Sequence, residues 1–212
     1  TGLYNMNKLL FELKKMNVND EKFCLVFFNV LNIEEISKYV DYSIIDIIIH
    51  KGIEHLKSQF KGNDLYSSNL HEYILVLKEY DENEIIKIIS KYLEDVLNAI
   101  HIKDYSFQLI VKVGIAFKNV ENYDVTEILN KARIAADQGE IYESGVYTYD
   151  DNFNKERKFF NEISGSLNNA IINNEFYLVY QPIINIKDNL VSDAEVLLRW
   201  NRGKREPVGP QM

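Results

Sequence analysis

The stretch that most constrains the fold is Leu65–Leu77, LYSSNLHEYILVL. Its second half, Tyr73–Leu77, is apolar at every position without helical spacing, which is typical of a strand buried on both faces. The segment Ser67–Asn69 suits a turn, because small polar side chains satisfy backbone groups locally. The sequence therefore predicts two short strands joined by a turn. His71 and Glu72 then lie at the rim of a central sheet, where an active site could be placed.

The rest of the first 150 residues alternates between helical and strand patterns. Apolar residues at helical spacing predict helices, and continuous apolar runs predict strands. The expected helices are Asn5–Met16, Ile33–Val40, a longer one with Ser43 as its N-cap, Asp81–Ile100 and Val125–Gln138. The expected strands, besides the hairpin, are Phe23–Val30, Phe107–Phe117, in which Gly114 marks either a close approach or a bulge, and Gly145–Tyr149. This order predicts an α/β fold, with a mixed central sheet flanked by helices.

The pattern changes after Asp150. Residues 151–174 form a charged and then amphipathic helical segment, and two strands follow at Phe176–Ile184 and Val191–Trp200. We therefore expect a first domain over residues 1–150, a linker helix over 151–174 and part of a second domain over 175–212.

A hairpin on its own would leave apolar side chains uncovered. Those expected to be exposed are Phe176, Leu178, Val179, Ile183, Val196, Leu197 and Trp200. We expect the segment to be disordered, packed on the first domain or paired with another chain.

Charge and composition narrow the classes of partner. The net charge is −8 and no basic stripe accompanies the aromatic residues, which argues against a nucleic-acid partner. A small anionic nucleotide needs only local donors and stays open. The single cysteine, Cys24, lies in an apolar run, so we expect a buried, reduced thiol and a cytoplasmic protein. The apolar cluster Ile44–Ile49 is too short to span a bilayer, so no membrane contact by this segment is expected.

Several motifs, taken in order, resemble those of GGDEF domains, the diguanylate cyclase family. Thr1–Asn5 is similar to the TGLxNR opening, and Phe27–Glu34 to a strand-and-helix motif that normally carries an Asp at position 29. Asn69–Tyr73, NLHEY, falls at the signature turn, and Val113–Ala116 resembles the SIGIA strand. The resemblance implies a nucleotidyl-cyclase palm-like fold with a ferredoxin-like core. It also implies a site that joins two GTP molecules with the help of two divalent cations.

The last part of the chain resembles the start of an EAL domain, the cyclic-di-GMP phosphodiesterase family. Tyr180–Ile183, YQPI, and Ala194–Trp200, AEVLLRW, carry this resemblance. It implies that Gln181 is the motif glutamine, Glu195 a metal ligand and Arg199 a contact to the dinucleotide phosphate. A phosphodiesterase site needs further carboxylates and a general base from later strands, so these three residues are remnants of an incomplete site here.

Departures from the GGDEF pattern fall on the expected metal ligands. Mg²⁺ prefers carboxylate oxygens, but the first metal Asp corresponds to Asn29 and the metal carboxylate of the turn to His71. Glu72 is retained. His71 could bind a softer metal, but no other histidine falls near it in the pattern, so we interpret it as a turn histidine. We expect no metal site and no functional catalytic residue.

The glycines of the signature turn are also replaced. Glycine lets the backbone approach nucleotide phosphates closely, whereas Asn69 and Leu70 stand at those positions. Asn69 can keep the turn, but Leu70 should fill space that a phosphate or sugar would need. The product-inhibition motif Arg-x-x-Asp has Phe60 and Asn63 at its two defining positions, so that site is expected to be absent.

Base recognition is only partly retained. The guanine-reading Asn corresponds to Ser37, while its companion Asp is kept as Asp46. Asp46 is either a solvated or capping acid near a helix start, or a guanine ligand. Glu34 and Glu140 replace two lysines and so reverse the charge, which weakens attraction for a triphosphate.

We therefore expect a catalytically inactive GGDEF domain with a regulatory or dimerisation role in a cyclic-di-GMP signalling protein of GGDEF–EAL type. The alternative is weak GTP binding through Asp46 and Glu72, which would control an EAL phosphodiesterase in the full-length parent; residual cyclase activity is a third hypothesis. The partners considered are a second copy of the chain, an upstream sensor domain and the rest of the EAL domain, with GTP or cyclic-di-GMP as ligands in the parent. No cofactor is expected in this chain, and Mg or Mn belongs to a complete EAL domain.

Overall fold

The computed structural model describes residues 2–78, 81–99, 101–102, 105–106, 109–118, 124–139 and 143–203. The predicted helix end at Ile100, the predicted strand start at Phe107 and the charge reversal at Glu140 lie outside these residues. The chain divides into two compact units, Thr1–Asp151 and Asn152–Met212, and each is described by itself.

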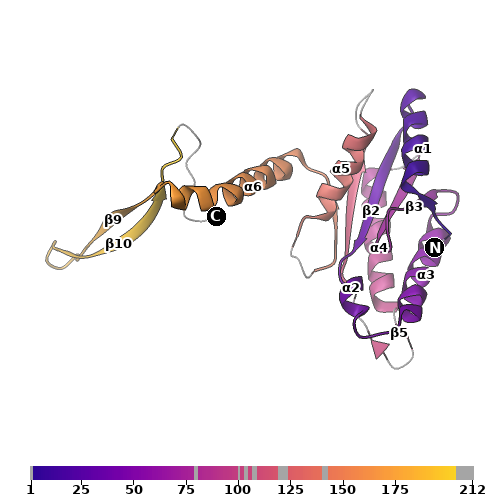
Figure 1. Ribbon diagram of the computed structural model, residues 1–212, viewed down its shortest axis with the longest axis horizontal. Coiled ribbons are helices and arrows are strands. Elements are labelled where there is room, and N and C mark those ends of the chain that lie inside the picture. The colour runs from indigo at the N-terminus through magenta and orange to yellow at the C-terminus, as the bar shows by residue number, and fades with distance from the viewer. Residues whose placement is uncertain are drawn as a thin grey trace. The chain divides into compact units, whose positions relative to one another are not determined.

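The first unit is built around a six-stranded mixed sheet (Figure 1). Its elements are β1 (Tyr4–Asn5), α1 (Met6–Val18), β2 (Phe23–Val30), α2 (Ile33–Ile36), α3 (Tyr42–Gln59), β3 (Asp64–Ser67), β4 (Glu72–Lys78), α4 (Glu82–Ala99), β5 (His101–Ile102), β6 (Tyr105–Ser106), β7 (Val111–Phe117), α5 (Val125–Ala136) and β8 (Gly145–Thr148). The strand order is β1-β3-β4-β2-β7-β8. β2 pairs antiparallel with both β4 and β7, whereas β1 and β8 pair parallel with their neighbours. The predicted α/β fold with a mixed central sheet is confirmed.

Two hydrophobic cores lie on opposite faces of the sheet. Side chains alternate along a strand, so Val26 and Phe28 of β2 enter one core while Leu25 and Phe27 enter the other. The first core is covered by α3 and α4 and is called the α3/α4 core below. The second, between the sheet and helices α1 and α5, is called the α1/α5 core.

Most predicted elements occur with nearly the predicted bounds, and β2 matches them at both ends. The hairpin also forms as predicted, with β3 and β4 antiparallel. One prediction is wrong: Ser43 is not the N-cap of α3, because the helix already begins at Tyr42 and Asp41 is the cap. Helix α2 ends at Ile36 rather than Val40.

The second unit contains one long helix and one hairpin. Helix α6 (Asp151–Ile172) is followed by β9 (Phe176–Ile184) and β10 (Val191–Trp200), which pair antiparallel (Figure 1). The two strands pair along their length, with one irregularity between Val191 and Asp193.

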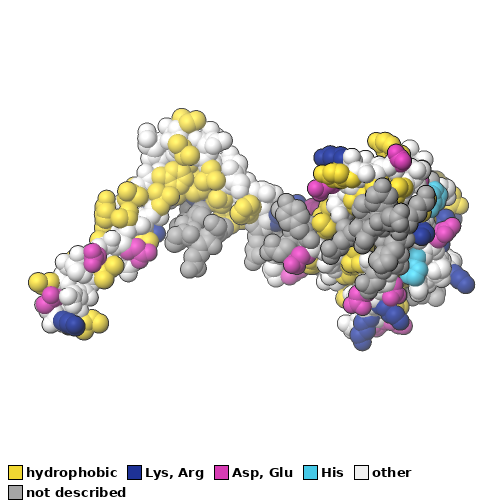
Figure 2. Space-filling view, turned by 90° about the horizontal axis from the view of Figure 1, so that it is seen from below, with side chains coloured by type: hydrophobic (Ala, Val, Ile, Leu, Met, Phe, Trp, Pro, Cys, Tyr) yellow, Lys and Arg dark blue, Asp and Glu magenta, His cyan; other side chains and the backbone are white. Residues whose placement is uncertain are grey.

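Apolar side chains are visible along this hairpin in Figure 2. Leu178, Ile183 and Val196 are exposed as predicted. Phe176, Val179, Leu197 and Trp200 are half-buried, so the predicted exposure holds for only part of the set. None of the helices among the described residues is long and apolar enough to cross a membrane.

Gly114 of β7 lies against the backbone of α5. A Cβ atom at this position would be 1.9 Å from the carbonyl oxygen of Ala132 and 2.3 Å from the amide nitrogen of Ala136. The close approach predicted at this glycine is confirmed.

We expect Gly114→Ala to lower the free energy of unfolding by about 1–3 kcal/mol or more, as in other overpacked cores, measured by urea denaturation.

The matched control is Gly52→Ala in α3, where a new Cβ meets no atom within 4 Å. This variant should gain about 0.5–1 kcal/mol, because glycine is the poorer helix former. Equal stability of the two variants would contradict the packing described for β7 and α5.

Cys24 is a free, fully buried thiol in β2. Burial raises its pKa to about 12, with a smaller contribution from the charge of Glu82. Because the thiolate is the reactive form, Cys24 should react with a disulfide reagent at pH 8 only as the first unit unfolds, which a urea series would follow. Rapid reaction in native buffer would contradict this burial.

The raised pKa of Cys24 also links the stability of the first unit to pH. The stabilisation from the buried neutral thiol is complete below pH 9 and is lost as the pH rises toward 12.

Candidate functional site

The signature turn is held by the side chain of Asn69. Its Oδ1 accepts hydrogen bonds from the backbone amides of His71 at 2.9 Å and Glu72 at 2.8 Å. The hydroxyl of Ser67 donates to the Asn69 carbonyl at 2.6 Å. Asn69 therefore keeps the turn, as predicted, and does so without a positive φ angle.

The tip of the turn is fastened to the α3/α4 core through Tyr73. This ring is buried, and its hydroxyl donates a hydrogen bond to the carbonyl of Leu70. Burial raises the pKa of the Tyr73 hydroxyl to about 12. The side chain of Leu70 is 57% exposed.

The sheet register brings Asn29 and Glu72 together. They are direct partners across β2 and β4, and the amide of Val30 donates to the His71 carbonyl at 2.9 Å. On the other side of β2, Asn29 is paired with Lys112 of β7. Since Phe27 enters the α1/α5 core, Asn29 two residues later lies on that face of the sheet.

Glu72, the retained carboxylate, already has partners within the chain. Its Oε2 lies 3.3 Å from Nη2 of Arg133 on α5, and it accepts a hydrogen bond from the hydroxyl of Ser68. The Arg133 guanidinium also lies 5.4 Å from the centre of the Phe27 ring. A side-chain cation therefore neutralises the one signature-turn carboxylate.

Lys112 places a second cation beside Asn29. The residue is 5% exposed, and its Nζ donates to the carbonyls of Gln138 at 3.1 Å and Gly139 at 3.2 Å. These carbonyls follow the end of α5, where the helix dipole favours positive charge. The ammonium group is thus used to fasten α5 to the sheet.

The donor set does not fit a magnesium ion. Among the residues that the structure describes, no three His, Cys, Asp or Glu side chains gather closely enough to hold a metal. The printed side-chain partners of Glu72 are the Ser68 hydroxyl and the Arg133 guanidinium, and the strand position opposite it holds the neutral amide of Asn29. Mg²⁺ requires several oxygen ligands, and nearby positive charge opposes its binding.

Asp46 is not brought to Glu72. It is exposed on α3, which covers the α3/α4 core, whereas Glu72 contacts Arg133 on the opposite face of the sheet. Within the described part of the chain, no hydrogen bond or ion pair joins Asp46 to the turn. Asp46 is also not the cap of α3, because Asp41 holds that position. Of the alternatives, a solvated acid fits its place, and guanine binding stays a prediction.

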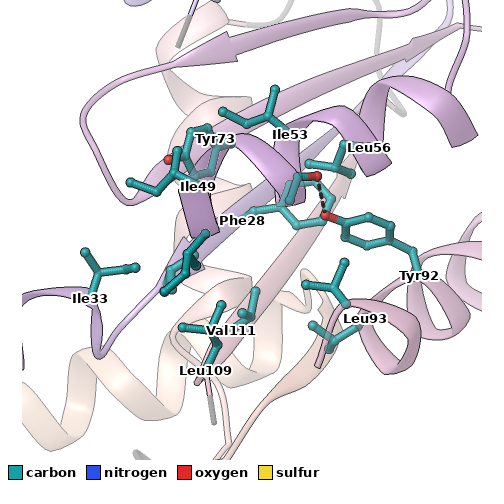
Figure 3. A pocket seen from close by; sticks show the side chains of 14 residues that line it. Phe28, Ile33, Ile49, Ile53, Leu56, Tyr73, Tyr92, Leu93, Leu109 and Val111 are labelled. Atoms are coloured by element: carbon teal, nitrogen blue, oxygen red, sulfur yellow. Dashed lines mark hydrogen bonds between the residues drawn. The ribbon is translucent and has the colours of Figure 1, made fainter. Parts of the chain in front are cut away.

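A cavity of about 50 Å³ lies on the α3/α4 face of the sheet (Figure 3). Its lining is almost entirely apolar and includes Phe28, Ile33 and Tyr73. The hydroxyl of Tyr92 donates to the Gly52 carbonyl at 3.1 Å at its edge. A cavity of this size and chemistry offers no place for a triphosphate.

A separate polar hollow of about 470 Å³ includes Phe60 and Asn63, the two positions of the product-inhibition motif. The side chain of Asn63 donates to the Phe60 carbonyl at 3.5 Å, so both residues serve the local chain turn.

In the second unit, the register places Gln181 opposite Glu195, and both are exposed. Arg199 lies on the same face of β10 as Glu195, opposite Tyr177. Gln181 and Glu195 are thus cross-strand neighbours, while Arg199 lies four residues further along the same face of β10.

Sequence reasoning missed Arg133 and Lys112. A signal was present in both cases. Arg133 is a half-buried cation four residues after the buried Leu129 of α5, and Lys112 interrupts an apolar strand. A charged residue inside an apolar strand usually has a specific partner.

No family model matches the chain. Among solved structures, the GGDEF domain of TpbB (YfiN) from Pseudomonas aeruginosa superimposes with a TM-score of 0.63 at 16% identity, covering 74% of this chain and 96% of that one. A diguanylate cyclase/phosphodiesterase structure from Caldicellulosiruptor saccharolyticus gives 0.56 at 19% identity, covering 70% and 90%. At these identities the likeness concerns the fold.

Two curated relatives match most of this chain. The oxygen sensor protein DosP of Escherichia coli is 26% identical over 204 residues, which is 95% of this chain and 25% of that protein. The uncharacterized protein y4lL of Sinorhizobium fredii is 22% identical over 168 residues, 78% of this chain and 20% of that protein. The chain thus spans about a quarter or less of the length of these relatives. The mixed sheet between two layers of helices is the fold of GGDEF domains.

Proposed function

We propose that the first unit is a regulatory GGDEF domain without cyclase chemistry, in a cyclic-di-GMP signalling protein of GGDEF–EAL type. The observation that carries this proposal is the ion pair of Glu72 with Arg133, at the strand position where Asn29 faces Glu72. The carboxylate that would hold a cation is occupied by a cation of the chain itself.

Electrostatics explain why this arrangement disfavours the cyclase reaction. Joining two nucleoside triphosphates requires divalent cations that neutralise phosphate charge and activate a hydroxyl. An amide at position 29 and an imidazole at position 71 supply no negative charge at neutral pH, and Arg133 neutralises Glu72. The site therefore has little attraction left for Mg²⁺.

For the rest of the chain, we propose that residues 151–174 are a linker helix and 175–212 the first part of an EAL domain. Support comes from the order of the YQPI and AEVLLRW motifs, from the register of Gln181 with Glu195 and from the exposed apolar residues of the hairpin. The relatives that match the chain are also much longer than it is. The role of the first unit would be to regulate or dimerise the parent protein.

Calorimetry with GTP and an activity assay test this proposal together. We expect no heat of binding at millimolar GTP with Mg²⁺, because the site lacks its anionic metal ligands. Incubation with GTP and Mg²⁺ or Mn²⁺ should yield no cyclic-di-GMP by chromatography. Formation of that product would falsify the proposal.

The same titration identifies the alternative, weak GTP binding. That alternative predicts a saturable heat of GTP binding without formation of cyclic-di-GMP. The heat should be lost in Asp46→Asn and kept in Asp41→Asn, and this result would show that the domain binds a nucleotide. Both variants remove one carboxylate from the start of α3, so the comparison isolates Asp46.

The ion pair can be tested on its own through Arg133→Met. Arg133 is 40% exposed, so solvent screening limits the expected loss of stability to about 1 kcal/mol. The amides of His71 and Glu72 should exchange hydrogen faster, because the turn loses its attachment to α5; NMR exchange measures this.

Lys131→Met is the matched control on the same helix. Lys131 pairs with Glu127 at 2.8 Å within α5, and losing that pair should cost a few tenths of a kcal/mol without affecting the turn. If Arg133→Met left exchange at the turn unchanged, the assigned role of the pair would be wrong.

A further inference from the structure

Arg202, two residues beyond β10, lies between the hairpin and α6. Its Nη2 is 2.7 Å from Oε1 of Glu162 on α6. The guanidinium is also 5.2 Å from the centre of the Trp200 ring and 5.7 Å from that of Phe159 on α6. The Arg202 side chain is 3% exposed. A planar cation is thus enclosed by one ring from each element and a carboxylate from the helix.

The chemistry of arginine suits this position. A guanidinium can contact aromatic faces on both sides while its edge donates to a carboxylate, which an ammonium group cannot do. Shielding from water strengthens both kinds of contact. Arg202 therefore links the end of β10 to the middle of α6.

A second connection fixes the start of the hairpin to the end of α6. Asn174 has a φ of 54°, and the amide of Glu175 donates to the Ala170 carbonyl at 2.9 Å. The amide of Asn174 donates to the Ile171 carbonyl at 3.2 Å, which completes a Schellman motif. The chain thus enters β9 from a closed helix end.

The two strands are also joined to each other next to this end. The indole Nε1 of Trp200 donates to Oε2 of Glu175 at 2.9 Å, and the amide of Asn201 donates to the Glu175 carbonyl at 2.8 Å. The rings of Phe176 and Trp200 lie 5.1 Å apart. The start of β9 and the end of β10 are therefore both attached to α6, at the middle of the helix and at its last turn.

We propose that Arg202 is a positioning residue that makes α6 and the β9–β10 hairpin one rigid body. A change in the position of α6 is then carried directly to β10, where Glu195 and Arg199 lie. This regulatory reading rests on the proposed function, in which the hairpin begins an EAL domain. The rigidity itself rests on the contacts of Arg202, Trp200 and Glu175 alone.

The test is a distance measurement by double electron–electron resonance. Spin labels are placed at Asn168→Cys on α6 and Ser192→Cys on β10, both exposed sites, in a chain that carries Cys24→Ala. With Arg202 present we expect one narrow distance distribution. Arg202→Met should broaden it about twofold, because the hairpin then moves against the helix. An unchanged narrow distribution in Arg202→Met would overturn the proposal.

Two further variants complete the experiment. Lys187→Met removes a cation from the exposed hairpin turn and should leave the distribution narrow. Arg202→Lys keeps the charge but not the contact with two rings, and should give an intermediate width.

Circular dichroism reports whether each variant keeps its helices. If Arg202→Met loses its helical signal, Arg202→Lys becomes the deciding variant. A distance distribution in Arg202→Lys as narrow as that of the wild type would then overturn the proposal. The measurement contains no nucleotide, so its outcome is independent of the GTP titration.

Discussion

The pairing of β2 on both of its edges is the constraint on which the candidate site depends. β4 and β7 are aligned with it residue by residue, and its side chains alternate between the two cores. This register places Asn29 between Glu72 and Lys112, on the face that α5 covers. Gly114 then lets α5 approach closely enough for Arg133 to reach Glu72. The charge at the site is therefore set by packing of the sheet against α5 as much as by the turn.

Long, strongly patterned elements were predictable from the sequence. β2 and most of β9 are apolar runs of strand length, and α4 has a clear helical repeat, so local spacing alone defines them. The turn at Asn69 was also predictable, because its side-chain chemistry is local. The loss of negative charge at positions 29 and 71 follows from residue type once the resemblance is recognised.

Features that depend on tertiary contacts were not predictable. The two-residue strand β1 exists through its parallel pairing with β3, and no periodicity can appear over such a length. Ser43 and Asp41 are both acceptable caps, and the packing of α3 on the sheet decides between them. The contact of Arg133 with Glu72 joins residues far apart in the chain, and only the register of β7 and the packing of α5 create it. The link from Arg202 to Glu162 arises in the same way.

The central claim is that the chain's own guanidinium replaces a divalent cation at Glu72. Crystals of this chain grown in Mn²⁺, with anomalous diffraction recorded at the manganese edge, test it most directly. The account predicts no anomalous peak between Asn29 and Glu72, with Arg133 still in contact with the Glu72 carboxylate. A manganese peak at Glu72 with Arg133 displaced would contradict it.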